Sequence, residues 1–193
     1  MLIFKKKIKK KKKKKIEKDK ELIFEIDSFL IGGNMNTETN TIEIPQKVFK
    51  EIRWHLIHFY ELDDYIKRRE NQLREELFDY YHFTNKNCLK NINSYGYTLE
   101  NCIIAIENDR KIKRLKTWKK LIRKYMNDVD NKNDFIEYWV TKYTFFDKRN
   151  IGFIKEHLNL DKQQFRNEIL LIFNELYRRA IEGRLYKEVA YNV

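Results

Sequence analysis

The sequence predicts an all-α fold, with a long N-terminal helix and a C-terminal module of three helices arranged as a helix-turn-helix. The 193 residues include one proline and five glycines, so few residues interrupt helices. Apolar residues recur at intervals of three and four over most of the chain after residue 44. No stretch alternates apolar and polar residues convincingly, as a half-buried strand would.

Residues 1–34 form a lysine-rich leader that we expect to stand outside the fold. They contain 12 lysines and 5 acidic residues, so they carry a net charge of +7, which is more than half of the +12 of the whole chain. At its end, the codons for Gly32 and Gly33 can spell the purine-rich core of a ribosome-binding site, with Asn34 as a spacer. We therefore expect Met35 to be the true start and the leader to be untranslated or disordered. The alternative is a real polybasic arm that binds nucleic acid.

The range 44–83 is predicted to be one long helix, with Pro45 in its first turn. Its apolar stripe consists of Phe49, Ile52, Leu56, Phe59, Leu62, Ile66, Leu73 and Leu77. A helix with so narrow a stripe needs another helix or another copy of the chain. The range 44–126 is therefore expected to be a helical region for dimerisation or interaction, with an Asn-rich linker at 84–97.

A second helix is predicted from Thr98 to about residue 126, and one flank of it is strongly basic. Between Arg110 and Lys124 there are nine lysines or arginines and no acid. Such a flank can lie along DNA phosphates while the apolar side packs inward. The phosphate-contacting candidates are Arg110, Lys111, Arg114, Lys119 and Arg123. The alternatives are a solvated helix surface and a helix that lies on a membrane surface.

The range 130–186 is predicted to hold the three-helix module, with helices at 134–147, 150–157 and 161–182. The expected inner faces are Phe135, Trp139 and Tyr143; Ile151, Ile154 and Leu158; and Phe165, Ile169, Ile172, Phe173 and Leu176. Asp161 can cap the third helix, Asn159 can adopt a left-handed backbone, and Gly183 closes the helix. A short helix, a tight turn and a capped helix form the plan of a helix-turn-helix.

Polar residues point outward at the start of the third predicted helix. They are Lys162, Gln163, Arg166 and Asn167. These side-chain types make bidentate contacts with guanine or adenine, and they lie where a recognition helix meets the major groove. We therefore regard them as candidate base-contacting residues. The alternative is that they are the solvated surface of a three-helix bundle.

The segment 135–176 resembles the region-4 module of sigma-70-type factors. In that module an aromatic-ended helix, a short helix, a turn and a recognition helix follow in order. This chain has "YTFF", then "GFIKEHLNL", then Asp161 in place of the capping serine and Phe165 in place of a valine. The larger pattern is similar to RinA-type phage transcriptional regulators, with "EIRWHLIHFYELDDYIKRREN" and "AIENDRKIKRLKTWKKLI" ahead of the module.

The resemblance implies a sequence-specific, DNA-binding transcriptional regulator similar to phage late-gene activators. Its partner would be double-stranded DNA, with Lys148, Arg149 and Lys155 as further phosphate contacts. The helix 44–83 would mediate self-association or contact RNA polymerase. Because 148–182 has seven basic and five acidic residues, the module alone is expected to bind phosphates weakly. The rival is a non-catalytic helical phage protein that serves as an interaction or packaging adaptor.

The sequence has no signature of an enzyme. It contains no glycine-rich phosphate loop and no activated nucleophile. Its four histidines and two cysteines match no metal-ligand spacing, so no metal or cofactor is expected. No apolar run approaches the ~20 residues that span a bilayer. We expect a cytoplasmic protein that does not enter a membrane.

Overall fold

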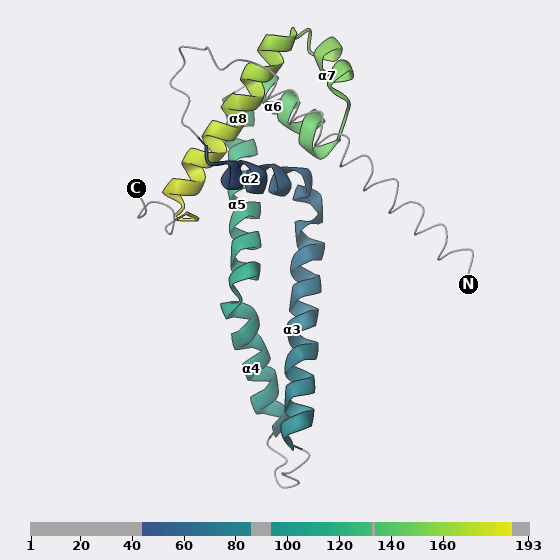
Figure 1. The fold of residues 1–193 in the computed structure, drawn as a ribbon, viewed down its shortest axis with the longest axis vertical. Coiled ribbons are helices and arrows are strands. Elements are labelled where there is room, and N and C mark those ends of the chain that lie inside the picture. Colours follow the sequence, from purple (N-terminus) through teal and green to yellow (C-terminus); the bar gives the residue numbers. More distant parts are fainter. Residues whose placement is uncertain (1–43, 86–93, 133, 187–193) are drawn as a thin grey trace, which may run out of the picture.

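The computed structural model describes residues 44–85, 94–132 and 134–186, so the leader 1–34 and the middle of the predicted linker lie outside the described residues. These ranges contain seven α-helices and no strand, which confirms the all-α prediction. The helices are α2 (Gln46–Ile57), α3 (Leu62–Asn85), α4 (Ser94–Asn108), α5 (Arg110–Asn131), α6 (Phe135–Thr141), α7 (Ile151–His157) and α8 (Lys162–Glu182). Figure 1 shows a stalk of α3 beside α4, and a head in which α2, α6, α7 and α8 gather around the end of α5.

The prediction of one helix over 44–83 is wrong. Helix α2 ends at Ile57, His58 leaves helical geometry, a 3₁₀ turn covers Phe59–Glu61, and α3 then begins. The two halves of the apolar stripe bury against different partners, because α2 packs on α8 and α5 whereas α3 packs on α4 and α5. In the turn, the ring of Phe59 stacks on Phe146 with centroids 5.0 Å apart. One straight helix could not make both sets of contacts.

The second predicted helix is also interrupted. Helix α4 begins at Ser94, inside the predicted linker, and ends at Asn108. The Asp109 carboxylate accepts a hydrogen bond from the backbone N–H of Ile112 at 2.8 Å and thereby caps α5. The same carboxylate accepts from Nη2 of Arg69 on α3 at 3.1 Å. Asp109 therefore separates α4 from α5 and ties the junction to α3.

The three helical segments of the C-terminal range lie where the sequence predicts them. Helix α6 continues into a π-helical turn at Lys142–Phe146, and α7 and α8 follow. Asp134, Asn150 and Asp161 cap α6, α7 and α8, because each side chain accepts a hydrogen bond from the backbone N–H of the third residue of its helix. The inner faces predicted for α7 and α8 are buried or half-buried, and Gly183 ends α8. Local apolar spacing and caps were sufficient to predict these elements.

The inner face predicted for α6 is wrong at Phe135. The side chain of Phe135 is 65% exposed, while Val140, Thr141, Thr144 and Phe145 are buried. Thr141 tolerates burial because its hydroxyl donates to the Glu137 carbonyl at 2.8 Å. The Thr141 hydroxyl also lies 3.2 Å from the Tyr125 hydroxyl of α5, so α6 packs against that helix at this point. Of the three predicted residues, Phe135 is exposed, whereas Trp139 and Tyr143 are half-buried.

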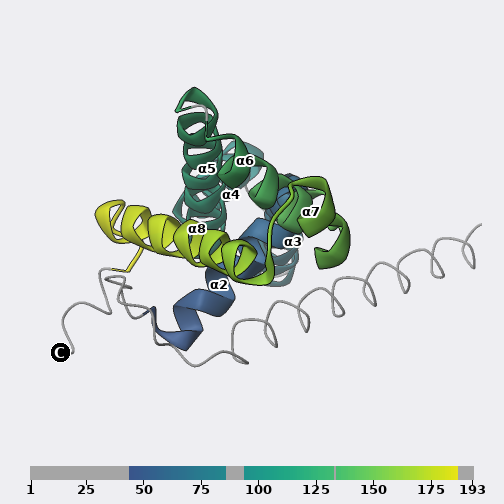
Figure 2. The same cartoon turned by 90° about the horizontal axis from the view of Figure 1, so that it is seen from above.

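The core of the head lies where α8 crosses α5 and α2, as Figure 2 shows from above. Its largest fully buried side chains include Trp118 and Tyr125 from α5, and Phe165 and Phe173 from α8. Phe173 stacks on the half-buried Phe49 of α2, with ring centroids 4.2 Å apart. Burying such aromatic side chains supplies much of the hydrophobic stabilisation of a small domain. In the described ranges no helix is both long and apolar enough to span a bilayer.

Candidate nucleic-acid interface

A tight turn joins α7 to α8 and fixes where α8 begins. Asn159 takes a left-handed backbone with φ 52°, as its type permits. Its neighbour Leu160 donates a backbone hydrogen bond to the Lys155 carbonyl at 2.8 Å. Asp161 and Gln164 form a reciprocal capping box, in which each side chain accepts from the other residue's backbone N–H at 2.7 and 2.8 Å. The first turn of α8 is therefore rigidly defined.

The four predicted base-contacting residues share the outer side of that first part of α8. Lys162, Gln163 and Asn167 are exposed, and Arg166 is half-buried. Gln163 Nε2 donates to Asn167 Oδ1 at 3.0 Å, so these two side chains meet across one helical turn. Inward-facing Phe165 and Ile169 are 1% exposed each, which prevents the helix from rotating about its axis. The structure thus brings the set together on one face.

Three predicted phosphate-contacting cations lie near α7. Lys148, which has a positive φ of 53°, is 3.9 Å from the carboxylate of Glu61. The guanidinium of Arg149 is exposed and lies 5.4 Å from the ring centroid of Phe153. Lys155 is half-buried in α7, and its backbone takes part in the turn that precedes α8. Arg149 and Lys155 are thus the cations that flank the helix pair.

The predicted basic flank of α5 is partly used inside the molecule. Lys119 Nζ donates to the Asp63 carboxylate of α3 at 2.5 Å, and this bond lowers the pKa of that carboxyl. Arg114 donates to Glu51 of α2. Arg110, Lys111 and Arg123 are exposed. The charges of Arg114 and Lys119 are therefore largely matched by acids of the same chain.

The flank also extends away from the first turn of α8. Arg110 and Lys111 begin α5 at the stalk, whereas Asp128, near the other end, contacts Arg179 in the last turn of α8. An α-helix rises 1.5 Å per residue, so Arg110 lies about 27 Å along α5 from Asp128. The structure does not bring Arg110 and Lys111 together with the outward residues of α8.

Glu51 of α2 is the centre of a polar cluster that includes residues of α5. Its carboxylate accepts from Arg114 Nη2 at 2.7 Å, Trp118 Nε1 at 3.1 Å and the Tyr186 hydroxyl at 3.3 Å. Burial raises the pKa of the Glu51 carboxyl, but hydrogen bonds from His55, Arg114 and Trp118 outweigh burial and hold it well below its usual range. Glu51 is therefore ionised at neutral pH and joins α2 to α5.

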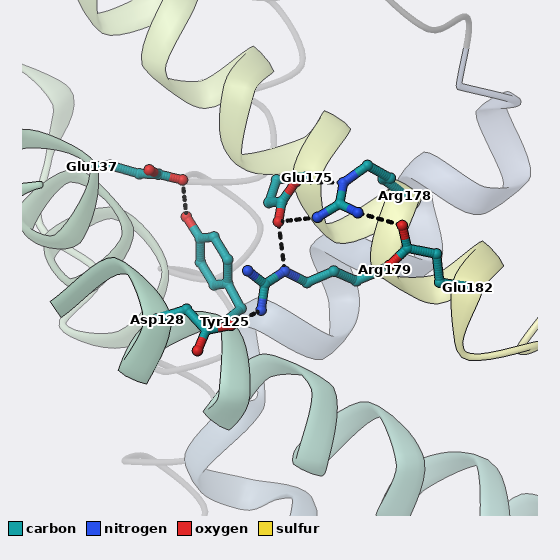
Figure 3. Close-up of polar contacts among 7 residues, drawn as sticks. All are labelled: Tyr125, Asp128, Glu137, Glu175, Arg178, Arg179 and Glu182. Atoms are coloured by element: carbon teal, nitrogen blue, oxygen red, sulfur yellow. Dashed lines mark hydrogen bonds and ion pairs between the residues drawn. The ribbon is translucent and has the colours of Figure 1, made fainter. Parts of the chain in front are cut away.

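A second polar cluster ties the C-terminal half of α8 to α5, and α5 to α6, as Figure 3 shows. Arg179 donates to Glu175 and to Asp128, both at 2.6 Å. Arg178 pairs with Glu175 at 2.7 Å and also with Glu182. Beside them, the buried Tyr125 hydroxyl donates to Glu137 at 2.8 Å. The C-terminal half of α8 is thus fixed to α5, and the N-terminal half carries the four predicted base-contacting residues.

Sequence reasoning missed both polar clusters. The spacing of Glu175, Arg178 and Glu182 on one helix was a usable signal, because residues three and four apart are neighbours. Asp128 and Arg179 are 51 residues apart, and Glu51 and Arg114 are 63 apart, so only the tertiary fold pairs them.

The described residues contain no group of three or more His, Cys, Asp or Glu side chains that could hold a metal ion. No family model matches the chain, and neither a curated protein nor a solved structure matches it.

Proposed function

We propose that this chain is a sequence-specific DNA-binding transcriptional regulator of the kind that phage late-gene activators represent, acting in the cytoplasm. In this proposal the first part of α8 enters the major groove, and Lys162, Gln163, Arg166 and Asn167 contact base edges. Arg149 and Lys155 contact phosphates on either side. The N-terminal part, α2 to α4, would self-associate or contact RNA polymerase.

One observation carries the proposal: the capped first turn of α8 presents amide and cationic side chains outward, while its inner face is fully buried. Gln163 and Asn167 lie side by side, and the amide of either residue can donate to N7 and accept from N6 of adenine. The short α7 and the tight turn before α8 match the plan of a helix-turn-helix. A reading helix must be held rigidly, and the ion pair between Arg179 of α8 and Asp128 of α5 supports that requirement.

The small number of cations on the α7–α8 face predicts a modest affinity for DNA. Counterion release scales with the number of phosphates neutralised, and few cations flank α8. Arg114 and Lys119 are paired with acids, so they add little to phosphate binding unless those pairs open. A dimer that places two α8 helices on adjacent half-sites would supply the missing affinity.

The test is selection of duplexes from a random pool by the full chain, followed by binding measurements at several salt concentrations. We expect an enriched sequence whose affinity falls as salt rises. The double variant Lys162→Ala, Arg166→Ala should lose the preference for that sequence. Lys50→Ala removes an exposed cation from α2 and serves as the matched control, which should bind as the parent does. Absence of duplex binding at ~50 mM salt would refute the proposal.

A helical protein-interaction or packaging adaptor is the second candidate. It is favoured by large apolar side chains on the surface of the head: Tyr60 is 67%, Phe135 65% and Leu171 56% exposed. Exposed apolar groups of this size are typical of protein-binding surfaces when they form a patch. Selection that enriches no sequence, combined with stable capture of one protein partner through these residues, would favour this candidate.

A further inference from the structure

An open pocket of about 450 Å³ lies between the end of α5 and the start of α6. The residues that matter in its wall are Asp130, Asp134, Phe135, Tyr138, Trp139 and Lys142. None of them belongs to the α7–α8 face described above. The aromatic part of its wall comes from α6, where Phe135 is exposed and Tyr138 and Trp139 are half-buried.

The pocket wall is aromatic. The ring of Trp139 lies edge-on to Tyr138, with centroids 5.5 Å apart, and 5.9 Å from the ring of Phe135. The ammonium of Lys142 sits 4.5 Å from the centroid of Trp139 and 5.8 Å from that of Tyr138. Aromatic faces attract cations within about 6 Å, and Trp is the strongest attractor. These faces are therefore already able to receive a cation.

The pocket is also negatively charged. Two exposed carboxylates, Asp130 and Asp134, and one cation, Lys142, line the pocket, so its lining carries a formal net charge of −1. The potential extends beyond the pocket: burial raises the pKa of the Glu168 carboxyl, and the charges of Asp134 and Glu137 raise it further. An anionic ligand such as a phosphate is repelled here, and a cation is favoured.

We propose that this pocket binds the guanidinium of an arginine that a partner protein inserts. A guanidinium is planar, so it can stack on Trp139 and at the same time donate a pair of hydrogen bonds to Asp130. A lysine ammonium is a strongly hydrated point charge without a flat face, and it makes only the first of these contacts well. This binding site is independent of the proposed DNA contacts.

Lys142 is a resident competitor in this proposal. Its ammonium occupies the aromatic faces when the pocket has no partner, and its long flexible side chain must move aside when the guanidinium enters. Replacing Lys142 by methionine keeps most of the apolar stem and removes the charge. The variant should therefore bind arginine more tightly, which a merely structural role for Lys142 would not produce.

The experiment follows the three tryptophan indole N–H signals of the ¹⁵N-labelled full chain by NMR. The probes are acetyl-Gly-Arg-Gly-amide and the same peptide with citrulline, which has the shape of arginine without its charge. Trp139→Leu identifies the indole signal of Trp139. We expect that signal to shift with the arginine peptide, and the citrulline peptide to bind at least about threefold more weakly.

The variants make the result decisive. Lys142→Met should tighten binding about two- to fivefold, and Asp130→Asn should weaken it about twofold. Glu75→Gln removes an exposed acid from the stalk and should leave binding unchanged. Equal binding of both peptides, or no shift of the Trp139 signal in Lys142→Met at ~10 mM arginine peptide, would overturn the proposal. Neither result depends on whether the chain binds DNA.

Discussion

Arg114 donates two hydrogen bonds to the carboxylate of Glu51, from Nε at 2.5 Å and from Nη2 at 2.7 Å. The pair joins α5 to α2 across 63 residues of sequence. A bidentate contact between a guanidinium and a carboxylate is the strongest common form of ion pair. Arg114, which the sequence suggested for phosphate binding, thus has a structural partner.

We predict that Arg114→Ala destabilises the fold by about 1–2 kcal/mol, because a charge-assisted hydrogen-bond pair to a half-buried carboxylate is lost. Urea unfolding of the purified chain measures this. Lys116→Ala is the matched control: Lys116 is exposed and its nitrogen lies 3.6 Å from Glu70, so its loss should cost less than about 0.5 kcal/mol. Equal costs for the two variants would contradict the structural role of Arg114.

Stability should also fall as the solution is acidified through the range of histidine. Burial lowers the pKa of His55 below its ordinary value of 6.5, although the nearby Glu51 acts in the opposite direction. The folded state then binds its proton less readily than the unfolded state does. The native state is therefore favoured above pH ~6.5 and loses stability as the pH falls from that value through the folded pKa.

The measurement for His55 is urea unfolding at pH 7.5 and 5.5, a window that keeps most carboxylates ionised. The groups that face the imidazole are Glu51, Arg114, His58, Trp54 and Trp118. His55→Phe keeps a flat ring on Trp118 and should reduce the difference between the two pH values. His157→Phe, on the exposed side of α7, should leave that difference as it is in the parent. If His157→Phe reduced the difference in stability between the two pH values and His55→Phe did not, His55 would not be the source of the pH dependence.

The cap of α8 provides a third prediction. Asp161→Ala should cost about 1 kcal/mol, because it leaves the backbone N–H of Gln164 without its partner and breaks the capping box. Asp161→Asn can accept the same hydrogen bond and should recover most of the loss. Thermal unfolding of both variants is the measurement. If alanine and asparagine destabilise alike, the cap does not hold the first turn of α8.

Arg166 tests how α8 contacts DNA, given the proposed function. Arg166→Ala should weaken binding to the selected duplex by ~1–3 kcal/mol and leave nonspecific binding unchanged. Arg178→Ala, at the other end of the same helix and paired with Glu175 and Glu182, is the control and should not alter DNA binding. A uniform loss on all sequences with Arg166→Ala would mean that this side chain contacts phosphate.

The parts of the fold that the sequence predicted well are those that local pattern determines. Phe165, Ile169 and Leu176 repeat at helical spacing between a cap and a terminal glycine, and all three are buried. The outward residues Lys162 and Gln163 follow from that same period, since a known inner face defines the outer one. The candidate interface on α8 was therefore predictable in position, although its function remains a proposal.

The predictions from sequence fail where tertiary contacts determine where a helix ends or which side chains it buries. No proline or glycine marks the bend at His58, and the contacts that hold it come from the distant Phe146. At Asp109 a signal was present, because an aspartate can cap a helix anywhere, but it lay within a continuous apolar stripe. On α6, hydrophobicity alone placed Phe135 in the core, but its side chain is exposed and Val140 and Thr141 are buried instead.

Helix α5 runs without a break from the stalk into the head. Its 22 residues span about 33 Å, with Arg110 beside the α3–α4 stalk and Asp128 held by α8. The Glu51–Arg114 pair lies only four residues from Arg110, and the buried Trp118 and Tyr125 follow it along the helix. The same helix that borders the stalk therefore also forms the core of the head, so α5 couples the two parts mechanically.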